Sequence, residues 1–250
     1  MFTQRLDNFL VQNKFCSKRS AKNFVLKNKV CVNGTIEKNY KANINPEHDK
    51  IFVNEKKIET QKHIYLMMNK PIGYVCSTVS DRSKTVYELL ENLKNENQNE
   101  FSKLHTIGRL DKDTEGLLLF TTDGNFSNFI TRKENQIKKT YYVELENSVD
   151  KKNQLLYKEK FEKGIFLPEE KKAKSFTTLP AKLNWISENS CNLTIEEGKF
   201  HQVRRMFLAM NNKVFFLKRV AIGKLNLDES LQKGNYRKLT DEEKNLLIQE

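Results

Sequence analysis

The sequence predicts an α+β protein in two parts, a small α–β module over residues 1–59 and a mixed, mainly antiparallel α+β domain over residues 60–250. Two observations lead to this prediction. Helical patterns and a hairpin signal occur early in the chain, and the polar, charged stretch Asn54–His63 is typical of a linker. Beyond it the chain changes to many short apolar runs with few helical patterns between them, which favours a sheet built largely of antiparallel strands.

The first part begins with two short helical patterns. The apolar residues at helical spacing are Leu6, Phe9 and Leu10 in one stretch and Ala21, Phe24 and Val25 in the next. Ser17 precedes the second stretch, where a hydroxyl can cap free backbone N–H groups. Asn33-Gly34 then predicts a hairpin over Val30–Ile36, because both residues tolerate the positive φ of a type I′ turn. A short strand at Ile51–Val53 completes the module.

The second part is expected to contain more strands than helices. Strands are predicted at Ile64–Met68, Leu117–Thr121, Thr140–Leu145, Ala181–Ile186, Cys191–Ile195 and Val214–Leu217. Helices are predicted at Asn125–Thr131, at Phe200–Met210 and at the C-terminus, where Thr240-Asp241-Glu242-Glu243 fits a capping box. Residues 92–100 and 133–139 are polar and are expected to be surface loops, and the Lys- and Glu-rich residues 147–163 carry no predicted site.

The composition indicates a polyanionic partner. The net charge is +12 and the pI is about 9.4, with the basic residues spread along the whole chain. Each Lys or Arg placed near a phosphate releases condensed counterions, so a nucleic acid is the expected partner. The alternative is that many of these lysines are ordinary solubilising surface residues.

The four cysteines argue against a zinc site and against a disulfide framework. Cys16, Cys31, Cys76 and Cys191 lie far apart, with no CxxC pair and no His at ligand spacing. The start of the chain carries charge where a signal peptide needs its apolar stretch, and no window approaches the ~18 apolar residues of a membrane span. We therefore expect a soluble, cytoplasmic protein with no metal.

A basic cluster surrounds the second helical stretch of the module. Its members are Lys14, Lys18, Arg19, Lys22, Lys27 and Lys29. Lys18 and Lys22 are four residues apart and would share a helix face, where like charges repel unless phosphates neutralise them. A solvated basic face explains the pattern equally well on these residues alone.

The same module resembles the S4 RNA-binding domain. The segments RLDNFL, SKRSA and VCVNG match that family's helix start, its basic turn and its hairpin, in the same order and at fitting spacings. The resemblance implies structured RNA as the partner, recognised mainly through phosphates and shape. It assigns Lys18, Arg19 and Lys22 to RNA binding.

The most informative stretch of the second part is a glycine-bounded polar loop, residues 108–116, that precedes the apolar run Leu117–Thr121. Asp111 lies in this loop with two further acids and two basic residues, and loops held by buried strands commonly carry reactive side chains. On these residues alone, Asp111 is also a typical turn residue that bonds to the backbone.

Residues 108–124 resemble the catalytic signature of the RsuA family of pseudouridine synthases, Gly-Arg-Leu-Asp-x-x-Thr-x-Gly-Leu-Leu-Leu-x-Thr-x-Asp-Gly. Further segments match in the family's order. They are Asn69-Lys70-Pro71-x-Gly73, Lys139-Thr140-Tyr141, Glu196–Met206, Arg219-x-x-Ile222-Gly223 and Gly234-x-x-Arg237-x-Leu239-Thr240. The resemblance covers nearly the whole chain and implies an S4-like module followed by a pseudouridine synthase domain.

The resemblance implies a role for each matching residue. Asp111 is the catalytic aspartate, Tyr141 stacks on the target base and helps remove a proton late in the reaction, and Arg204 pairs with Asp111 and orients it. Arg109 fills the gap left in the RNA when the base is flipped out. A carboxylate acts as nucleophile or base only while ionised, and a neighbouring guanidinium stabilises that charged form.

Lys70, His201 and Arg205 are expected to contact RNA, with packing as the alternative for His201 and a structural contact as the alternative for Lys70 and Arg205. The reaction oxidises nothing and loses no group, so the resemblance implies no cofactor. No exposed apolar stripe demands a second copy of the chain, and we expect a monomer.

The substrate is expected to be a uridine of small-subunit (16S) ribosomal RNA, free or in a partly assembled subunit. The segments that most resemble family members acting on this RNA are Pro46–Asp49, Gly73–Thr78, Leu104-His105 and His201-Gln202. Large-subunit (23S) ribosomal RNA is the first alternative. A non-catalytic, S4-type RNA-binding assembly factor is the second, and it would predict the loss of Asp111, Tyr141 or Arg204, all of which are present.

Overall fold

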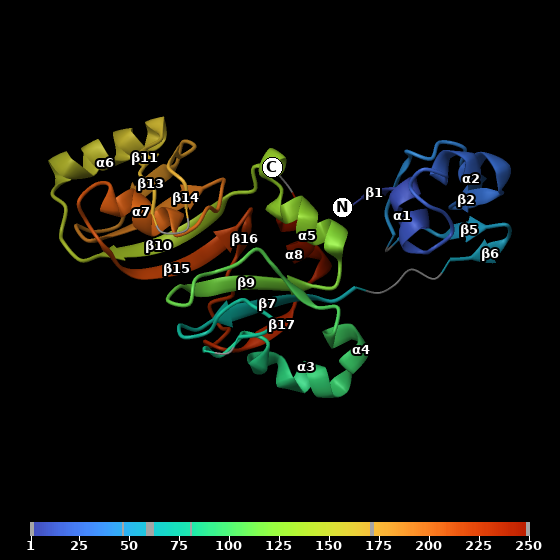
Figure 1. The fold of residues 1–250 in the computed structure, drawn as a ribbon, viewed down its shortest axis with the longest axis horizontal. Coiled ribbons are helices and arrows are strands. Elements are labelled where there is room, and N and C mark those ends of the chain that lie inside the picture. Colours follow the sequence, from blue (N-terminus) through green and yellow to red (C-terminus); the bar gives the residue numbers. More distant parts are fainter. Residues whose placement is uncertain (1–2, 47, 59–62, 81, 171–172, 249–250) are drawn as a thin grey trace. The chain divides into compact units, whose positions relative to one another are not determined.

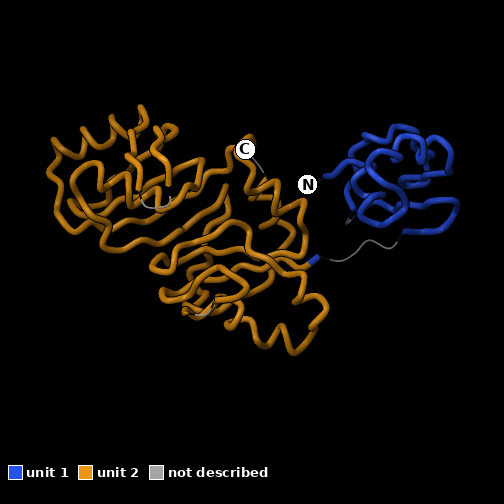
Figure 2. The backbone as a smooth tube through the Cα atoms, in the orientation of Figure 1, with its two compact units in different colours: residues 1–63 blue, residues 64–250 orange. Residues whose placement is uncertain are grey.

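The computed structural model describes residues 3–46, 48–58, 63–80, 82–170 and 173–248. Figure 1 shows the order of the elements along the chain. Figure 2 shows the division into two compact units, which we call unit 1 (residues 1–63) and unit 2 (residues 64–250). The boundary expected between residues 59 and 60 lies outside the described residues.

Unit 1 combines two helices with short strands. In chain order its elements are β1 (Gln4–Arg5), α1 (Leu6–Gln12), α2 (Ala21–Lys27), β2 (Val30–Val32), β3 (Thr35–Ile36), β4 (Asn43–Ile44), β5 (Ile51–Val53) and β6 (Lys56–Lys57). The strands form a sheet in the order β3-β2-β5-β6 and a separate β1-β4 pair. The predicted β2–β3 hairpin is confirmed, and its turn residues Asn33 and Gly34 have φ of 50° and 86°.

The core of unit 1 forms where the helices meet the strands. Leu6 and Leu10 of α1 are fully buried, together with Val25 of α2, Val30 of β2 and Ile51 of β5. The spacing that predicted the two helices therefore corresponds to their buried faces.

One expectation for unit 1 is confirmed and one needs correction. The Ser17 hydroxyl accepts from the backbone N–H of Ser20 at 3.3 Å in the turn that leads into α2, although α2 itself begins at Ala21. The stretch expected to be a linker from Asn54 onward begins with β6, which pairs with β5. Its two lysines are exposed, so no apolar pattern marks the strand.

Unit 2 is built on one large sheet. Its strands are β7 (Tyr65–Lys70), β8 (His105–Ile107), β9 (Glu115–Thr121), β10 (Lys139–Leu145), β11 (Phe166–Leu167), β12 (Phe176–Thr177), β13 (Lys182–Trp185), β14 (Ser190–Ile195), β15 (Val214–Ile222), β16 (Leu225–Asn226) and β17 (Tyr236–Lys238). Its α-helices are α3 (Glu91–Glu96), α4 (Gln98–Phe101), α5 (Gly124–Thr131), α6 (Lys151–Lys163), α7 (Gln202–Leu208) and α8 (Asp241–Leu246). Short 3₁₀ turns occur at Glu88–Leu90 and Lys133–Asn135.

The large sheet has the strand order β13-β14-β10-β15-β9-β7-β17, with β16 paired to β15 and β8 paired to β9. Its described pairs are antiparallel except that of β9 with β15, which is parallel. The α+β fold with a mainly antiparallel sheet is thus confirmed. Residues along β9 are buried on both faces, which explains the continuous apolar run after residue 116.

Three helices lie where none was predicted. Residues 92–100, expected to be a loop, form most of α3 and α4, and residues 151–163 form α6, which lies beside β13 in Figure 1. On α6 only Tyr157 and Phe161 are buried, so its apolar stripe has too few members to be recognised in the sequence. Within the part of the chain that the structure describes, no helix is long and apolar enough to cross a membrane.

Candidate active site

A buried lysine holds the loop that carries Asp111. Lys70, at the end of β7, has no exposed surface, and its Nζ donates to the carbonyl oxygens of Pro71 (3.1 Å), Asp111 (3.0 Å) and Thr114 (2.9 Å). Burial lowers the pKa of this ammonium. The expected contact between Lys70 and RNA is therefore wrong, because all three donors of the buried amine bond to main-chain carbonyls, two of them in the loop.

A close backbone approach follows the loop. Gly116 has φ of +100° and pairs with Arg219 across the parallel β9–β15 contact. A Cβ at this position would collide with the backbone oxygen of Arg219. Only glycine combines that φ with so short an approach, so Gly116 sets the distance between the loop and β15.

The loop, the ends of β10 and β15 and the start of α7 enclose a pocket of about 550 Å³. Asp111 lines it together with Tyr141 and His201. The basic residues that line it besides Arg204 and Arg219 are Arg109, Lys112, Lys133, Lys139 and Lys199, and its acidic residues are Asp111, Glu196 and Glu197. A concave site with more basic than acidic residues favours a polyanionic ligand.

Asp111 presents its carboxylate to this pocket. The side chain is 37% exposed, and Oδ1 lies 3.7 Å from Nε2 of His201. The main-chain carbonyl of Asp111 closes a turn by accepting from Thr114 N–H at 3.1 Å. Among the described residues no backbone group donates to the carboxylate, so its oxygens stay available to a ligand.

His201 is held in an unusual conformation beside Asp111. It precedes α7 with φ of 47°, and its ring is stacked on Phe200 with centroids 3.8 Å apart and an interplanar angle of 15°. The left-handed backbone directs the imidazole toward the loop and away from the helix. The structure thus brings His201 to Asp111, a relation that the sequence did not indicate.

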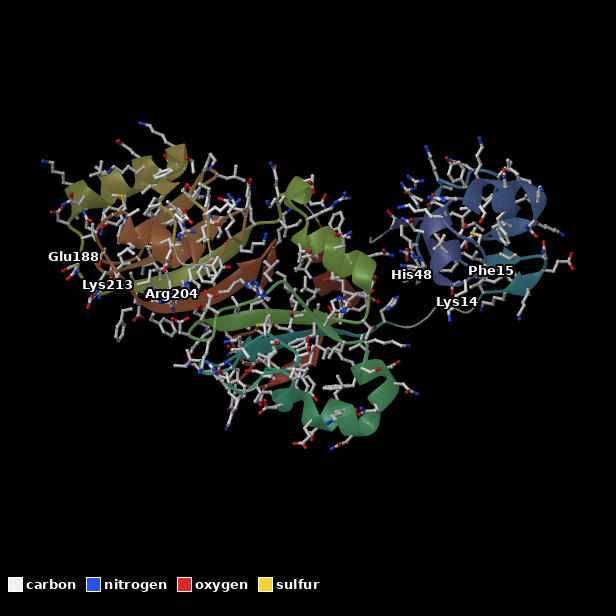
Figure 3. All side chains as sticks on the ribbon, viewed as in Figure 1. Lys14, Phe15, His48, Glu188, Arg204 and Lys213 are labelled. Carbon is white, nitrogen blue, oxygen red and sulfur yellow. The ribbon has the colours of Figure 1, made fainter. Side chains whose placement is uncertain are left out.

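Arg204, on the following turn of α7 and labelled in Figure 3, does not form the expected ion pair with Asp111. Its Nη2 instead lies 3.1 Å from Oδ2 of Asp113 and donates to the Asp113 carbonyl at 3.0 Å. Its Nη1 donates to the carbonyl of Val214 at 3.2 Å. Arg204 therefore ties the loop to β15 two residues beyond Asp111, and it can orient the carboxylate only through the loop backbone.

Arg205 is a structural residue. It is 5% exposed, and its Nη2 donates to the carbonyl of Pro168 at 2.6 Å while Nε lies 3.5 Å from Glu170. The expectation that Arg205 contacts RNA is wrong. The pattern placed it beside Arg204 on one flank of the helix, whereas the side chain is buried with the apolar residues of α7.

Tyr141 and Arg109 both line the pocket that Asp111 faces. Tyr141 is 8% exposed on β10, and its ring lines the pocket that Asp111 faces. Arg109 is exposed and lines the same pocket, and within the described chain it forms no hydrogen bond or ion pair. It is therefore available to contact a ligand.

Two pocket residues were not recognised as site residues from the sequence, although both fall in matched segments. Lys139 begins β10, and its Nζ donates to the carbonyl of Glu196 at 3.0 Å. Burial, followed by the charge of Arg219, lowers the pKa of Lys139 to about 8. Arg219 is 4% exposed on β15. The sequence signal that could have identified both is a basic residue within a run of residues that is otherwise typical of a buried strand.

The basic cluster of unit 1 lies at the surface. Lys18, Arg19 and Lys22 are all exposed, as is Lys14, which Figure 3 labels next to Phe15. Lys18 precedes α2 and Lys22 lies in its first turn, so the two do not share one helix face as expected. In the ranges that the structure describes, no group of three or more His, Cys, Asp or Glu side chains could hold a metal ion.

Comparison with known proteins gives consistent relatives. A family model described as RNA pseudouridylate synthase matches residues 63–209, and an S4 domain model matches residues 4–50. The ribosomal small subunit pseudouridine synthase A of Haemophilus influenzae is 38% identical over 244 residues, covering 98% of this chain and 99% of that protein. The protein of the same name from Escherichia coli K12 is 40% identical and covers 96% and 97%.

One solved structure extends this similarity to the fold. A crystal structure of pseudouridylate synthase is 38% identical in sequence, has a TM-score of 0.67, and covers 98% of this chain and 100% of that chain.

Proposed function

The chain belongs to the RNA pseudouridylate synthase family and carries an S4 domain, and from this premise we propose that it converts one uridine of small-subunit ribosomal RNA to pseudouridine with Asp111 as the catalytic carboxylate. We assign RNA binding to residues 1–59 and catalysis to residues 60–250. Its relatives named ribosomal small subunit pseudouridine synthase A, similar over nearly their whole length, support the choice of RNA.

The reaction is an isomerisation. The bond between N1 of uracil and C1′ of the ribose breaks, the base turns, and C5 joins C1′, while C5 loses a proton and N1 gains one. A uridine stacked in RNA must leave the stack before a side chain can reach C1′. In this proposal Arg109 occupies the vacated position, and the ring of Tyr141 holds the base while it turns.

The observation that best supports the proposal is the position of Asp111. Its carboxylate faces a pocket of about 550 Å³. Lys70 holds the loop at the carbonyls of Asp111 and Thr114, and Arg204 holds it at Asp113. A pocket of this size admits a nucleotide, and a carboxylate fixed by its backbone is preorganised for reaction at C1′. His201 is the basic group beside it.

We also propose that Lys18, Arg19 and Lys22 bind RNA phosphates, that the protein acts as a monomer, and that it works where ribosomes are assembled, in the cytoplasm. Exposure of the three basic side chains and the net charge of +12 support the first of these. The substrate is free RNA or a partly assembled subunit.

The test is pseudouridine mapping of ribosomal RNA, by carbodiimide labelling and primer extension, in cells with and without this gene. We expect one pseudouridine to disappear from small-subunit RNA, to return with the wild type, and to stay absent with Asp111→Asn. Asp150→Asn is the matched control, because Asp150 caps α6 and Asn is an equally good cap. Loss of a large-subunit site would move the target, and no loss would leave a non-catalytic RNA-binding protein.

A further inference from the structure

A buried guanidinium, that of Arg219, lines the candidate active-site pocket and has one donor without a hydrogen-bond partner. Arg219 is 4% exposed, and its Nε donates to the carbonyl of Leu117 at 2.8 Å. Its Nη2 is buried and has no hydrogen-bond partner. Buried donors in native proteins are almost always paired, because a buried donor left unpaired is destabilising. An orphaned donor in a ligand pocket is therefore evidence for a ligand atom.

Arg219 lies opposite the base-stacking residue. The register pairs it with Tyr141 across the β10–β15 contact, so the two side chains leave the sheet on the same face. Both line the pocket, as does Leu217 two residues earlier on β15. A base stacked on Tyr141 would have its edge within the part of the pocket that Arg219 lines.

Lys139 adds a second cation at the same place. It lines the pocket from the start of β10, and Arg219 is near enough to disfavour its protonation. Glu196 and Glu197, from the loop after β14, act in the opposite direction. The Glu197 carboxylate is already bonded to Leu179 N–H, to Gln202 and to Lys199. Among the described residues, neither Lys139 nor Arg219 forms an ion pair with a carboxylate.

The reaction supplies an anion at that position. When the bond from C1′ to N1 breaks, its electron pair stays on uracil, and the negative charge spreads over the ring and its two carbonyl oxygens. This holds whether Asp111 attacks C1′ or removes a proton from the sugar. The charge disappears when C5 joins C1′, and the ring then loses the C5 proton and gains one at N1, so the product is neutral. A donor that is unpaired in the free enzyme stabilises this state more than it stabilises neutral uridine.

We propose that Arg219, through Nη2 and with the ammonium of Lys139 beside it, binds a carbonyl oxygen of the uracil ring and stabilises the charge that the ring carries once it is detached from C1′. This inference rests on the proposed function and adds two residues to its chemistry. The developing charge lies on the base, so the two cations act on the bond-breaking step and contribute little to RNA affinity.

The experiment measures single-turnover pseudouridine formation by tritium release from RNA labelled at C5 of uridine, using the full-length protein. Arg219→Gln is expected to lower the rate about 10²-fold while RNA affinity stays within about twofold. Arg219→Lys, which keeps the charge, should recover part of the loss. Lys218→Met is the control, because Lys218 precedes Arg219 on β15 and does not line this pocket.

Thio-substituted substrates identify the ligand atom. Sulfur in place of O2 or O4 of the target uracil accepts hydrogen bonds poorly, so one of these substitutions should slow the wild type and leave Arg219→Gln unaffected. If Arg219→Gln melts at a much lower temperature than the wild type, the same comparison is made with Lys139→Met. Equal sensitivity of wild type and variant to both substitutions would overturn the proposal.

Two other outcomes are separable. If the wild type forms pseudouridine and Arg219→Gln matches its rate, this inference fails and the proposed function stands. A methylphosphonate beside the target uridine removes one phosphate charge. If its effect on the rate is lost in Arg219→Gln while the effects of both thio-substitutions remain, the guanidinium binds phosphate and the proposal is wrong. A wild type that forms no pseudouridine on any ribosomal RNA contradicts the proposed function itself.

Discussion

The imidazole Nε2 of His201 lies 3.7 Å from Oδ1 of Asp111. Arg204, three residues later in the sequence, forms an ion pair with Asp113 instead. The imidazole is thus the side chain that faces the carboxylate on which the proposed reaction depends. His201 therefore takes, in this structure, the place beside Asp111 that the motif assigned to Arg204.

Replacing His201 by Asn should lower the rate about tenfold, because the carboxylate of Asp111 loses the imidazole that faces it. Asn is chosen because it tolerates the left-handed backbone at this position. Single-turnover rates measure the effect, and His105→Asn, which changes a histidine outside the pocket, is the control. An unchanged rate would mean that the 3.7 Å contact has no influence on the carboxylate.

Replacing Gly116 by Ala should unfold unit 2 or remove its activity. The new Cβ would meet the Arg219 backbone at a residue with φ of +100°, and neither strand can move without losing its pairing. Circular dichroism melting compares it with Gly124→Ala, where no atom lies within 4 Å of the new Cβ. Equal melting temperatures for the two variants would contradict the tight β9–β15 contact.

Replacing Lys70 by Met should destabilise the protein by about 1–3 kcal/mol, because three main-chain carbonyl groups lose their buried donor. The single-turnover rate should also fall, by more than the loss of folded protein explains, since one of these carbonyls belongs to Asp111. Urea unfolding and single-turnover assays measure both. Lys84→Met, at an exposed position, controls for the loss of one positive charge. A stable variant whose only defect is weak RNA binding would restore the original expectation for Lys70.

Replacing Lys18, Arg19 and Lys22 by Gln should weaken RNA binding and reduce the slope of log K against log salt by about 2 to 3, one counterion for each lost phosphate contact. Catalysis on bound RNA should be unchanged. Filter binding across a salt series measures the slope.

The matched control for that charge change is Gln at Lys151, Lys152 and Lys158, three exposed positions on α6. If both triple variants changed the slope equally, the effect would be one of net charge, and the basic cluster of unit 1 would have no special part in binding.

The rate of the wild type should fall as the pH rises through about 8, because the Lys139 amine, whose pKa burial and Arg219 lower to about 8, then loses its charge. Lys139→Arg keeps a charge at every accessible pH and should move this loss to higher pH. The charged groups that face Lys139 are Arg219, Glu196 and Glu197. A pH profile identical in the two proteins would exclude Lys139 as the titrating group.

The same shift has a consequence for stability with a definite sign. The unfolded chain holds the Lys139 proton up to the ordinary value of 10.5, whereas the folded chain releases it near 8. Between these values the unfolded state binds more protons, so this residue's contribution to the free energy of unfolding should increase with pH. Urea titrations of wild type and Lys139→Arg at pH 7.5 and 9.5 measure it.

Sequence patterns predicted the parts of the fold in which burial is periodic. The apolar spacing in α1 and α2, the Asn33-Gly34 turn and the continuous run in β9 all correspond to elements that the structure contains. The pattern failed for α6, where two buried aromatic residues suffice because the helix packs mainly against β13.

The candidate site was predictable as a set of residues and not as a set of contacts. The signature contains Asp111, yet it does not show that the Lys70 amine donates to backbone carbonyls or that Arg204 bonds to Asp113. Those outcomes depend on ångström-scale register between β7, β9 and β15, which a linear pattern does not encode. His201 reaches Asp111 through one left-handed residue, which has no sequence signal in a histidine.

The pairing of β17 with β7 has a consequence for the time at which this enzyme becomes active. The most C-terminal strand that the structure describes, Tyr236–Lys238, completes the edge of the sheet against β7, Tyr65–Lys70, which carries the lysine that holds the Asp111 loop. A growing polypeptide can fold unit 1 while translation continues, because domains fold as units from the N-terminus. Unit 2, which holds the Asp111 pocket, stays unfinished until β17 has been synthesised, so a nascent chain can complete unit 1 well before it completes the pocket.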